Sequence, residues 1–139
     1  MRRLLAVLGV CVATAIGFTA PAFAGSPHFV SASVTNVTTS SITVSFKEAG
    51  LGNEPTVNIT LTATAECING GSNHPKAANK EGVGASGTFN VNNGQATGSL
   101  TATTTLSCSP PMTIAWTNVL VTDTSNNTSK SIPGTFSAG

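Results

Sequence analysis

The residues best suited to chemistry gather in one polar stretch, 68–82. Amide, imidazole and ammonium groups occur there on Asn69, Asn73, His74, Lys76, Asn79 and Lys80. Such groups donate and accept hydrogen bonds, as recognition of a polar ligand requires. A long loop in a compact domain is usually functional or disordered, and binding residues are often carried on loops of a rigid scaffold. We predict a binding loop here. The alternative is a solvated connection whose asparagines form turns.

No recognisable catalytic set accompanies this loop. A serine hydrolase needs a nucleophile, a base and an orienting acid. After residue 24 the histidines are His28 and His74, the one aspartate is Asp123, and no serine lies in a Gly-x-Ser-x-Gly turn. We therefore expect no enzyme activity. The alternative is a small hydrolase or inhibitor built from His74, Asp123 and a serine.

The sequence also contains no metal-binding pattern. It has no His-Glu-x-x-His stretch and no aspartate-rich loop of the calcium-binding kind. The two cysteines beyond residue 24, Cys67 and Cys108, are better explained as partners of each other. We expect no metal and no cofactor.

The balance of charge excludes a nucleic-acid partner. After residue 24 there are four lysines, five acidic residues and no arginine. Binding to nucleic acid draws its affinity from neutralised phosphates, and so few scattered lysines cannot supply it.

The strand patterns place Phe46, Phe89 and Trp116 in the core, which leaves no aromatic platform for a sugar. An extracellular protein, or a glycan held by asparagines of the 68–82 loop, remains the expected partner.

The first 24 residues have the layout of a secretory signal peptide. Arg2 and Arg3 precede an uncharged apolar run over 4–17, and Ala22-Phe23-Ala24 forms a cleavage motif. That run is shorter than the roughly 20 residues that span a bilayer. We predict cleavage after Ala24, secretion, and a mature chain without a transmembrane segment. A lipid anchor on Cys11 is the alternative, but Val10 before it is larger than such signals use.

An even number of cysteines in an exported chain predicts a disulfide. Cys67 and Cys108 allow only one pairing within the mature chain. Closing a loop of this size stabilises a fold by roughly 4 kcal/mol through the entropy of the unfolded chain, before any strain.

Two stretches alternate strictly between apolar and polar residues, as half-buried strands do. The first, 56–67, has apolar residues at odd positions from Val57 to Cys67. The second, 95–108, has them at even positions from Leu100 to Cys108. Both cysteines therefore share the inward parity of their strands, and we expect the disulfide in the core.

Shorter strands are predicted over 28–36, 41–47, 83–92, 113–123 and 129–136, and none of the chain after Ala24 has a helical period. Asn92-Asn93-Gly94 predicts a hairpin between the strands of Phe89 and Leu100. The inward phase changes at Thr117-Asn118, which predicts either a bulge or a strand covered on both faces. Pro133 limits the last strand to an edge or a bulge. Seven such strands favour one immunoglobulin-like two-sheet sandwich over 25–139, a monomer, with a small barrel as the alternative fold.

The 67–80 stretch also carries a resemblance. Its Cys-x-Asn-x-Gly motif at Cys67, its Pro75, its Asn79-Lys80 end and the later Cys108 resemble uncharacterised small secreted proteins of actinobacteria. The resemblance implies an exported immunoglobulin-like domain and transfers no site residue. The enediyne carrier proteins of the same bacteria are similar in size and composition, but they carry a second disulfide that this chain lacks.

Together these patterns predict a secreted, non-catalytic domain that binds its partner through the 68–82 loop. A structural or cell-surface coat protein, with threonine-rich outer faces as its working surface, is the alternative from another class.

Overall fold

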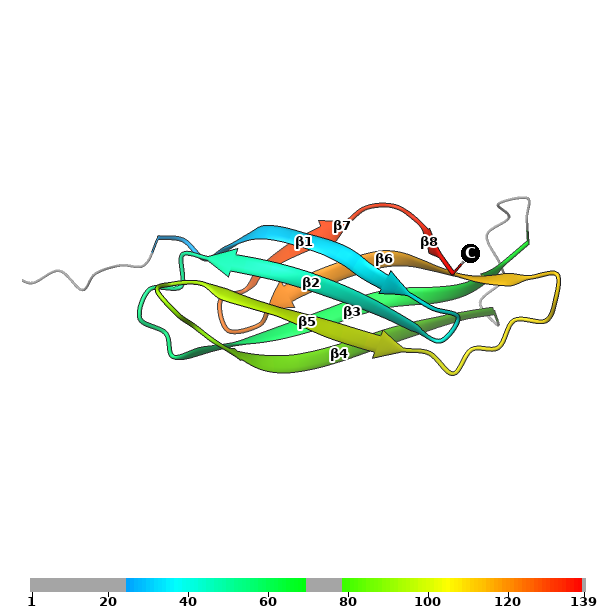
Figure 1. Cartoon of the computed structure of the whole chain (residues 1–139), viewed down its shortest axis with the longest axis horizontal. Coiled ribbons are helices and arrows are strands. Elements are labelled where there is room, and N and C mark those ends of the chain that lie inside the picture. The colour runs from blue at the N-terminus through cyan, green and yellow to red at the C-terminus, as the bar shows by residue number, and fades with distance from the viewer. Residues whose placement is uncertain (1–24, 70–78, 139) are drawn as a thin grey trace, which may run out of the picture.

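The computed structural model describes residues 25–69 and 79–138, so the predicted signal peptide lies outside the described residues. The described chain forms two antiparallel sheets that face each other (Figure 1). The strands are β1 (His28–Val37), β2 (Ser41–Ala49), β3 (Thr56–Ile68), β4 (Lys80–Asn90), β5 (Ala96–Thr103), β6 (Thr113–Asp123), β7 (Thr128–Ile132) and β8 (Phe136–Ser137). The predicted all-β sandwich is confirmed, with eight strands in place of seven.

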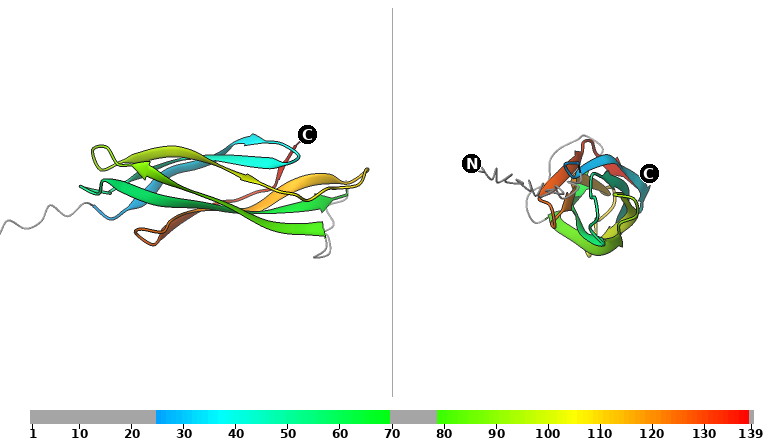
Figure 2. Two further views of the ribbon diagram at one scale, coloured as in Figure 1. Left: turned by 90° about the horizontal axis from the view of Figure 1, so that it is seen from below. Right: turned by 90° about the vertical axis from the view of Figure 1, so that its left-hand side faces the viewer.

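The first sheet has the order β1-β2-β5 and the second has the order β4-β3-β6-β7, with β8 added beside β6. Figure 2 shows the strands wrapping around a common interior when the molecule is viewed along its length. No ladder of the described strands joins one sheet to the other. The molecule is therefore a sandwich, and the small barrel is not formed.

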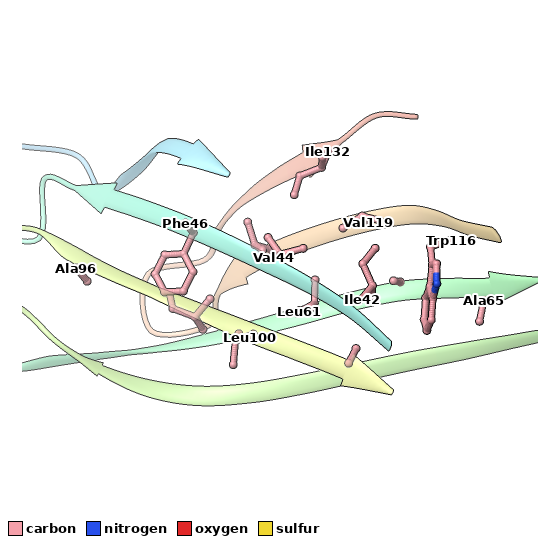
Figure 3. Close-up of a cluster of buried hydrophobic side chains, with 14 of the residues drawn as sticks. Ile42, Val44, Phe46, Leu61, Ala65, Ala96, Leu100, Trp116, Val119 and Ile132 are labelled. Carbon is pink, nitrogen blue, oxygen red and sulfur yellow. The ribbon is translucent and has the colours of Figure 1, made fainter. Parts of the chain in front are cut away.

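Alternate side chains of the two sheets fill the interior, as the sequence patterns predict (Figure 3). Ile42 and Val44 of β2 meet Ile59 and Leu61 of β3, and all four are fully buried. Burying each such side chain contributes about 1.5–3 kcal/mol. Trp116 is also fully buried, and its indole nitrogen donates to the Thr38 carbonyl at 3.2 Å, which satisfies the one polar atom it brings inside.

The outer faces explain the abundance of threonine and serine. Hydroxyls of facing strands hydrogen bond in pairs, Thr43 with Thr101 and Ser45 with Ser99, each at 2.8 Å. Such cross-strand pairs contribute roughly 0.2–1 kcal/mol each. Threonine also suits a pleated, half-exposed surface, so these residues serve the fold directly.

The predicted inward phase of the first strand is wrong at its start. Alternation places Val30 inside with Ala32 and Val34, but Val30 is 52% exposed. A register shift between Phe29 and Ser31 changes the phase, so that Phe29 turns inward instead. Its ring packs edge-on against Phe46, with 6.1 Å between centroids.

The predicted hairpin pairing of the Phe89 and Leu100 strands is also wrong. The turn forms, with reciprocal backbone hydrogen bonds between Asn92 and Gln95, but beyond it the strands separate. β4 pairs with β3 and β5 pairs with β2, so they become edges of opposite sheets. The ring of Phe89 lies between them, against Gly98 of β5 and 4.8 Å from the ring of Phe46.

Several strand boundaries differ from prediction. β5 ends at Thr103 rather than at Cys108, because the chain then leaves the first sheet for the second. β3 extends to Ile68 and β4 begins at Lys80, which shortens the predicted 68–82 loop. The last strand divides into β7 and β8 around Pro133-Gly134. The predicted bulge at Thr117-Asn118 is confirmed by a register shift and a φ of 52° at Asn118.

Two carboxyl groups meet inside the end of the sandwich farthest from the disulfide. Glu48 ends β2 on the first sheet, Asp123 ends β6 on the second, and both are fully buried. Asp123 accepts hydrogen bonds from the backbone of Ser125 and from the backbone and side chain of Asn126. Among the described residues, neither oxygen of Glu48 has a donor, but a protonated Glu48 can itself donate to Asp123.

The pKa of Glu48 is raised from 4.5 to about 8. The largest cause is burial, followed by the hydrogen bond to Asp123 and by the negative charges of Asp123 and Glu54. The folded protein therefore holds a proton that the unfolded chain loses above the ordinary glutamate pKa. Because folding takes up this proton, stability must fall as pH rises from that ordinary value toward the raised one, and then level off.

The close approach of Phe89 to Gly98 leads to a first prediction. Even the single methyl group of an alanine at position 98 would run into the Phe89 ring, so Gly98→Ala should destabilise the fold by about 1–3 kcal/mol through overpacking. Gly82→Ala is the matched control, because no atom of the described residues lies within 4 Å of a Cβ at Gly82. Thermal unfolding of both variants measures the difference, and equal melting temperatures would contradict this packing.

A second prediction concerns Glu48→Gln, which keeps the shape of the side chain and removes its titration. The unfolding free energy of the wild type should fall by an amount on the order of a few kcal/mol between about pH 5 and about pH 9, while that of the variant stays nearly level. Urea unfolding across this range measures both slopes. Glu81→Gln, with the same change of charge at the other end of the molecule, should keep the wild-type slope. A level wild-type curve would refute the protonated state of Glu48.

Candidate functional site

The predicted disulfide is present at the opposite end of the sandwich. Cys67 and Cys108 are joined, with Cα atoms 5.4 Å apart. Cys67 is buried in β3, whereas Cys108 is half-buried in the segment 104–112 that carries the chain from β5 to β6. The bond therefore ties the crossing between the sheets to the end of β3.

A cleft of about 470 Å³ opens beside this bond, and we call it the sheet-end cleft. It is bordered by residues 39–40, 104–108 and 112–114 and by Ala138. Leu106, Met112 and Ile114 give it apolar character, and serine and threonine residues supply hydroxyl groups. A hollow that combines apolar side chains with hydroxyl groups suits a ligand that has both apolar and polar groups.

One bank of the cleft is the turn between β1 and β2. The hydroxyl of Thr38 accepts hydrogen bonds from the backbone amides of Ser40 and Ser41 at 3.1 and 2.8 Å. The Thr38 carbonyl accepts from the indole of Trp116, and the Ser40 carbonyl accepts from the amide of Thr104 at 2.9 Å. These contacts fix the turn to the core and to the other bank.

The other bank is held by a carboxylate. Glu81 lies on the inward parity of β4 and accepts hydrogen bonds from the Thr104 hydroxyl and from the amide and hydroxyl of Thr105, the last two at 3.0 and 3.2 Å. The hydrogen bond from the Thr104 hydroxyl holds the pKa of Glu81 below its ordinary value. Desolvation, the next largest effect, opposes it, and weaker hydrogen bonds from Thr105 and Leu106 add to the lowering. The charged carboxylate thus clamps β4, an edge of the second sheet, to the chain leaving the first.

A second hollow of about 330 Å³ lies on the outer face of the second sheet, and we call it the Glu66 pocket. Glu66 of β3 is only 4% exposed, although its parity points outward. One carboxylate oxygen accepts from the Thr117 hydroxyl at 3.1 Å, and the other lies 3.6 Å from the Lys80 ammonium. Thr64, Asn118, Ser131 and the β7–β8 connection complete its lining.

The structure places three of the six predicted binding residues. Asn69 is exposed directly after β3, Asn79 is half-buried just before β4, and Lys80 pairs with Glu66 on the outer face. Lys80 therefore belongs to the Glu66 pocket and not to the sheet-end cleft. The other three, Asn73, His74 and Lys76, lie outside the described residues.

Sequence analysis missed the two carboxylates that organise this end, Glu66 and Glu81. A signal for Glu81 was present, because it shares the inward parity of Val83 and Ala85. The sequence contains no such signal for Glu66, because it lies among outward-facing threonines and is covered by residues distant in sequence.

Two observations bear on other kinds of site. In residues 25–69 and 79–138, no three histidine, cysteine or acidic side chains come together as a metal ion would need. The same part of the chain has no helix of the length and apolarity needed to cross a membrane.

The Glu81 clamp leads to a prediction about Thr105. We expect Glu81→Gln to lower the hydrogen-exchange protection of the Thr105 amide, because the neutral amide is a weaker acceptor than the carboxylate. Since the pKa of Glu81 is lowered, the wild-type clamp should persist at and above the ordinary glutamate pKa and weaken as pH falls through the lowered value. Protection factors measured by NMR against pH test both points.

Glu54→Gln, at the far end of the sandwich, serves as the control and should leave Thr105 unchanged. Equal protection of Thr105 in the wild type and in Glu81→Gln at neutral pH would show that the carboxylate does not hold this bank.

Comparison of the chain with models of protein families, with curated proteins and with solved structures finds no match. Function is therefore inferred from the geometry of the two hollows.

Proposed function

We propose that the chain is exported, that residues 1–24 are removed, and that the mature immunoglobulin-like domain is a non-catalytic binding module. Its ligand, an extracellular protein or glycan, docks at the disulfide end and enters the sheet-end cleft. The 68–82 loop, predicted from sequence as the binding loop, leaves β3 next to Cys67 at this same end.

The single observation that carries the proposal is that both banks of the cleft are fixed before any ligand arrives. The Thr38 turn is held by the Trp116 indole, and the 104–108 bank by Glu81 and by the disulfide. A site that is already ordered loses little conformational entropy on binding, so more of the contact energy appears as affinity.

Export is supported by the chemistry of the cysteines. Disulfides form and persist in oxidising compartments and are rare where thiols are kept reduced. The Cys67–Cys108 bond joins elements far apart in sequence and so serves the architecture of the domain.

The hydroxyl-rich outer faces favour binding in the cleft over a coat role. On the first sheet the hydroxyls of Thr43, Ser45, Ser99 and Thr101 already bond to one another. Hydroxyls satisfied in this way have less capacity left for a partner.

The test uses a variant that fills the cleft. Ser107 is exposed and borders the cleft, so Ser107→Arg should block it without disturbing the core. Mature wild-type domain, immobilised, is used to capture a partner from the medium and cell surface of the producing organism, and the purified partner is then titrated. We expect Ser107→Arg to weaken its binding at least about tenfold, or about 1.4 kcal/mol, at an unchanged melting temperature.

Thr97→Arg is the matched control, because Thr97 is an exposed residue of β5 outside the cleft. It should bind as the wild type does. A purified partner that binds Ser107→Arg as tightly as the wild type, or the failure of the wild type to retain any partner, would contradict a ligand site in the cleft.

A further inference from the structure

The Glu66 pocket is a separate hollow, formed where the regular ladder of the second sheet is interrupted. Between Thr62 and Thr64 the register of β3 with β6 shifts, and Asn118 on β6 adopts a φ of 52°. The β7–β8 connection at Pro133-Gly134 borders the same place. Bulges commonly re-aim side chains next to functional sites, and here one opens a hollow of about 330 Å³ on a sheet face that is otherwise regular.

The carboxylate of Glu66 is buried but only partly satisfied. An ionised carboxylate offers about four lone pairs to donors. The described contacts use one for Thr117, and the Lys80 ammonium stands at a longer 3.6 Å. A buried charge with unused acceptor capacity is costly unless further donors reach it, and the open side of the pocket is where such donors can enter.

The charge of the pocket selects against ionic ligands. An anion would meet the carboxylate of Glu66, and a cation would meet the ammonium of Lys80, since the two groups are paired. The remaining polar lining is neutral, with hydroxyls on Thr64, Thr117 and Ser131 and an amide on Asn118. A matching ligand is therefore uncharged, and its polar groups must both donate and accept hydrogen bonds.

We propose that the Glu66 pocket binds a neutral sugar residue through two adjacent hydroxyl groups. One hydroxyl donates to the Glu66 carboxylate, and its neighbour accepts from the Lys80 ammonium. The Asn118 amide borders the same hollow; its nitrogen donates to the Thr64 hydroxyl at 3.4 Å and has a second N–H to offer a ligand. The volume lies at the lower end of the roughly 300–1,000 Å³ typical of small-molecule sites, which suits one sugar ring. The site lies outside the sheet-end cleft and goes beyond the function proposed for it.

The expected affinity is weak, because the pocket has no aromatic ring in its lining on which a sugar could stack. Isotope-labelled mature domain is titrated by NMR with glucose, galactose, mannose and N-acetylglucosamine, and with glucuronate and glucosamine as charged counterparts. We expect at least one neutral sugar to shift the amide signals of Glu66, Thr117 and Asn118 with a millimolar dissociation constant. The charged counterparts should bind more weakly.

Two variants test the roles of the residues. Glu66→Gln should weaken binding of that sugar at least tenfold, and Asn118→Gly, which suits the positive φ and removes the amide, should weaken it several-fold. Glu54→Gln at the far end should bind as the wild type does. The second variant keeps the test decisive if Glu66→Gln fails to fold.

The proposal is overturned if no neutral sugar shifts these signals, if the shifts fall elsewhere, or if either Asn118→Gly or a folded Glu66→Gln binds as tightly as the wild type. Tighter binding of glucuronate or glucosamine would also overturn it, because the ligand would then be ionic. Ser107→Arg separates this site from the sheet-end cleft, since it should leave the sugar titration unchanged whether or not the cleft binds a partner.

Discussion

The two sheets of this domain are held at their spacing mainly by packed side chains, because no ladder of the described strands connects them. Every other feature follows from how that gap is filled and closed. Trp116 and the aliphatic residues of β2 and β3 fill its centre. The Cys67–Cys108 bond closes one end, and the buried Glu48 and Asp123 meet at the other. The ring of Phe89 occupies the edge between β4 and β5.

The two ends are closed by chemistry of different kinds. The disulfide is covalent and leaves room beside it for a cleft with fixed banks. The Glu48–Asp123 contact depends on a proton, because two buried carboxylates so close together cannot both be charged without a large cost. The end at Glu48 and Asp123 is therefore sensitive to pH around the raised pKa of Glu48.

Period-two alternation was sufficient to predict the sandwich and most of its core, because inward parity depends only on the local chain. It correctly placed Trp116 and Cys67 inside, whereas Cys108 lies half-buried beyond the end of β5 rather than on the inward side of a strand. Alternation failed where a strand distant in sequence determines the register or the pairing. Val30 is exposed because of a bulge against β2. β4 separates from β5 because each pairs with a strand of its own sheet. The Glu66 pocket could not be foreseen, since its walls come from β3, β4, β6 and the β7–β8 connection.

The placement of Cys108 has a consequence for how the molecule matures. Its partner Cys67 ends a strand of the second sheet, while Cys108 sits in the crossing that forms one bank of the cleft. Before oxidation, that crossing would be anchored beside the cleft mainly by the Glu81 carboxylate and the Thr104 amide. Under the function proposed above, a chain with free thiols would have an incompletely secured cleft, so full competence to bind would follow oxidation of the two cysteines.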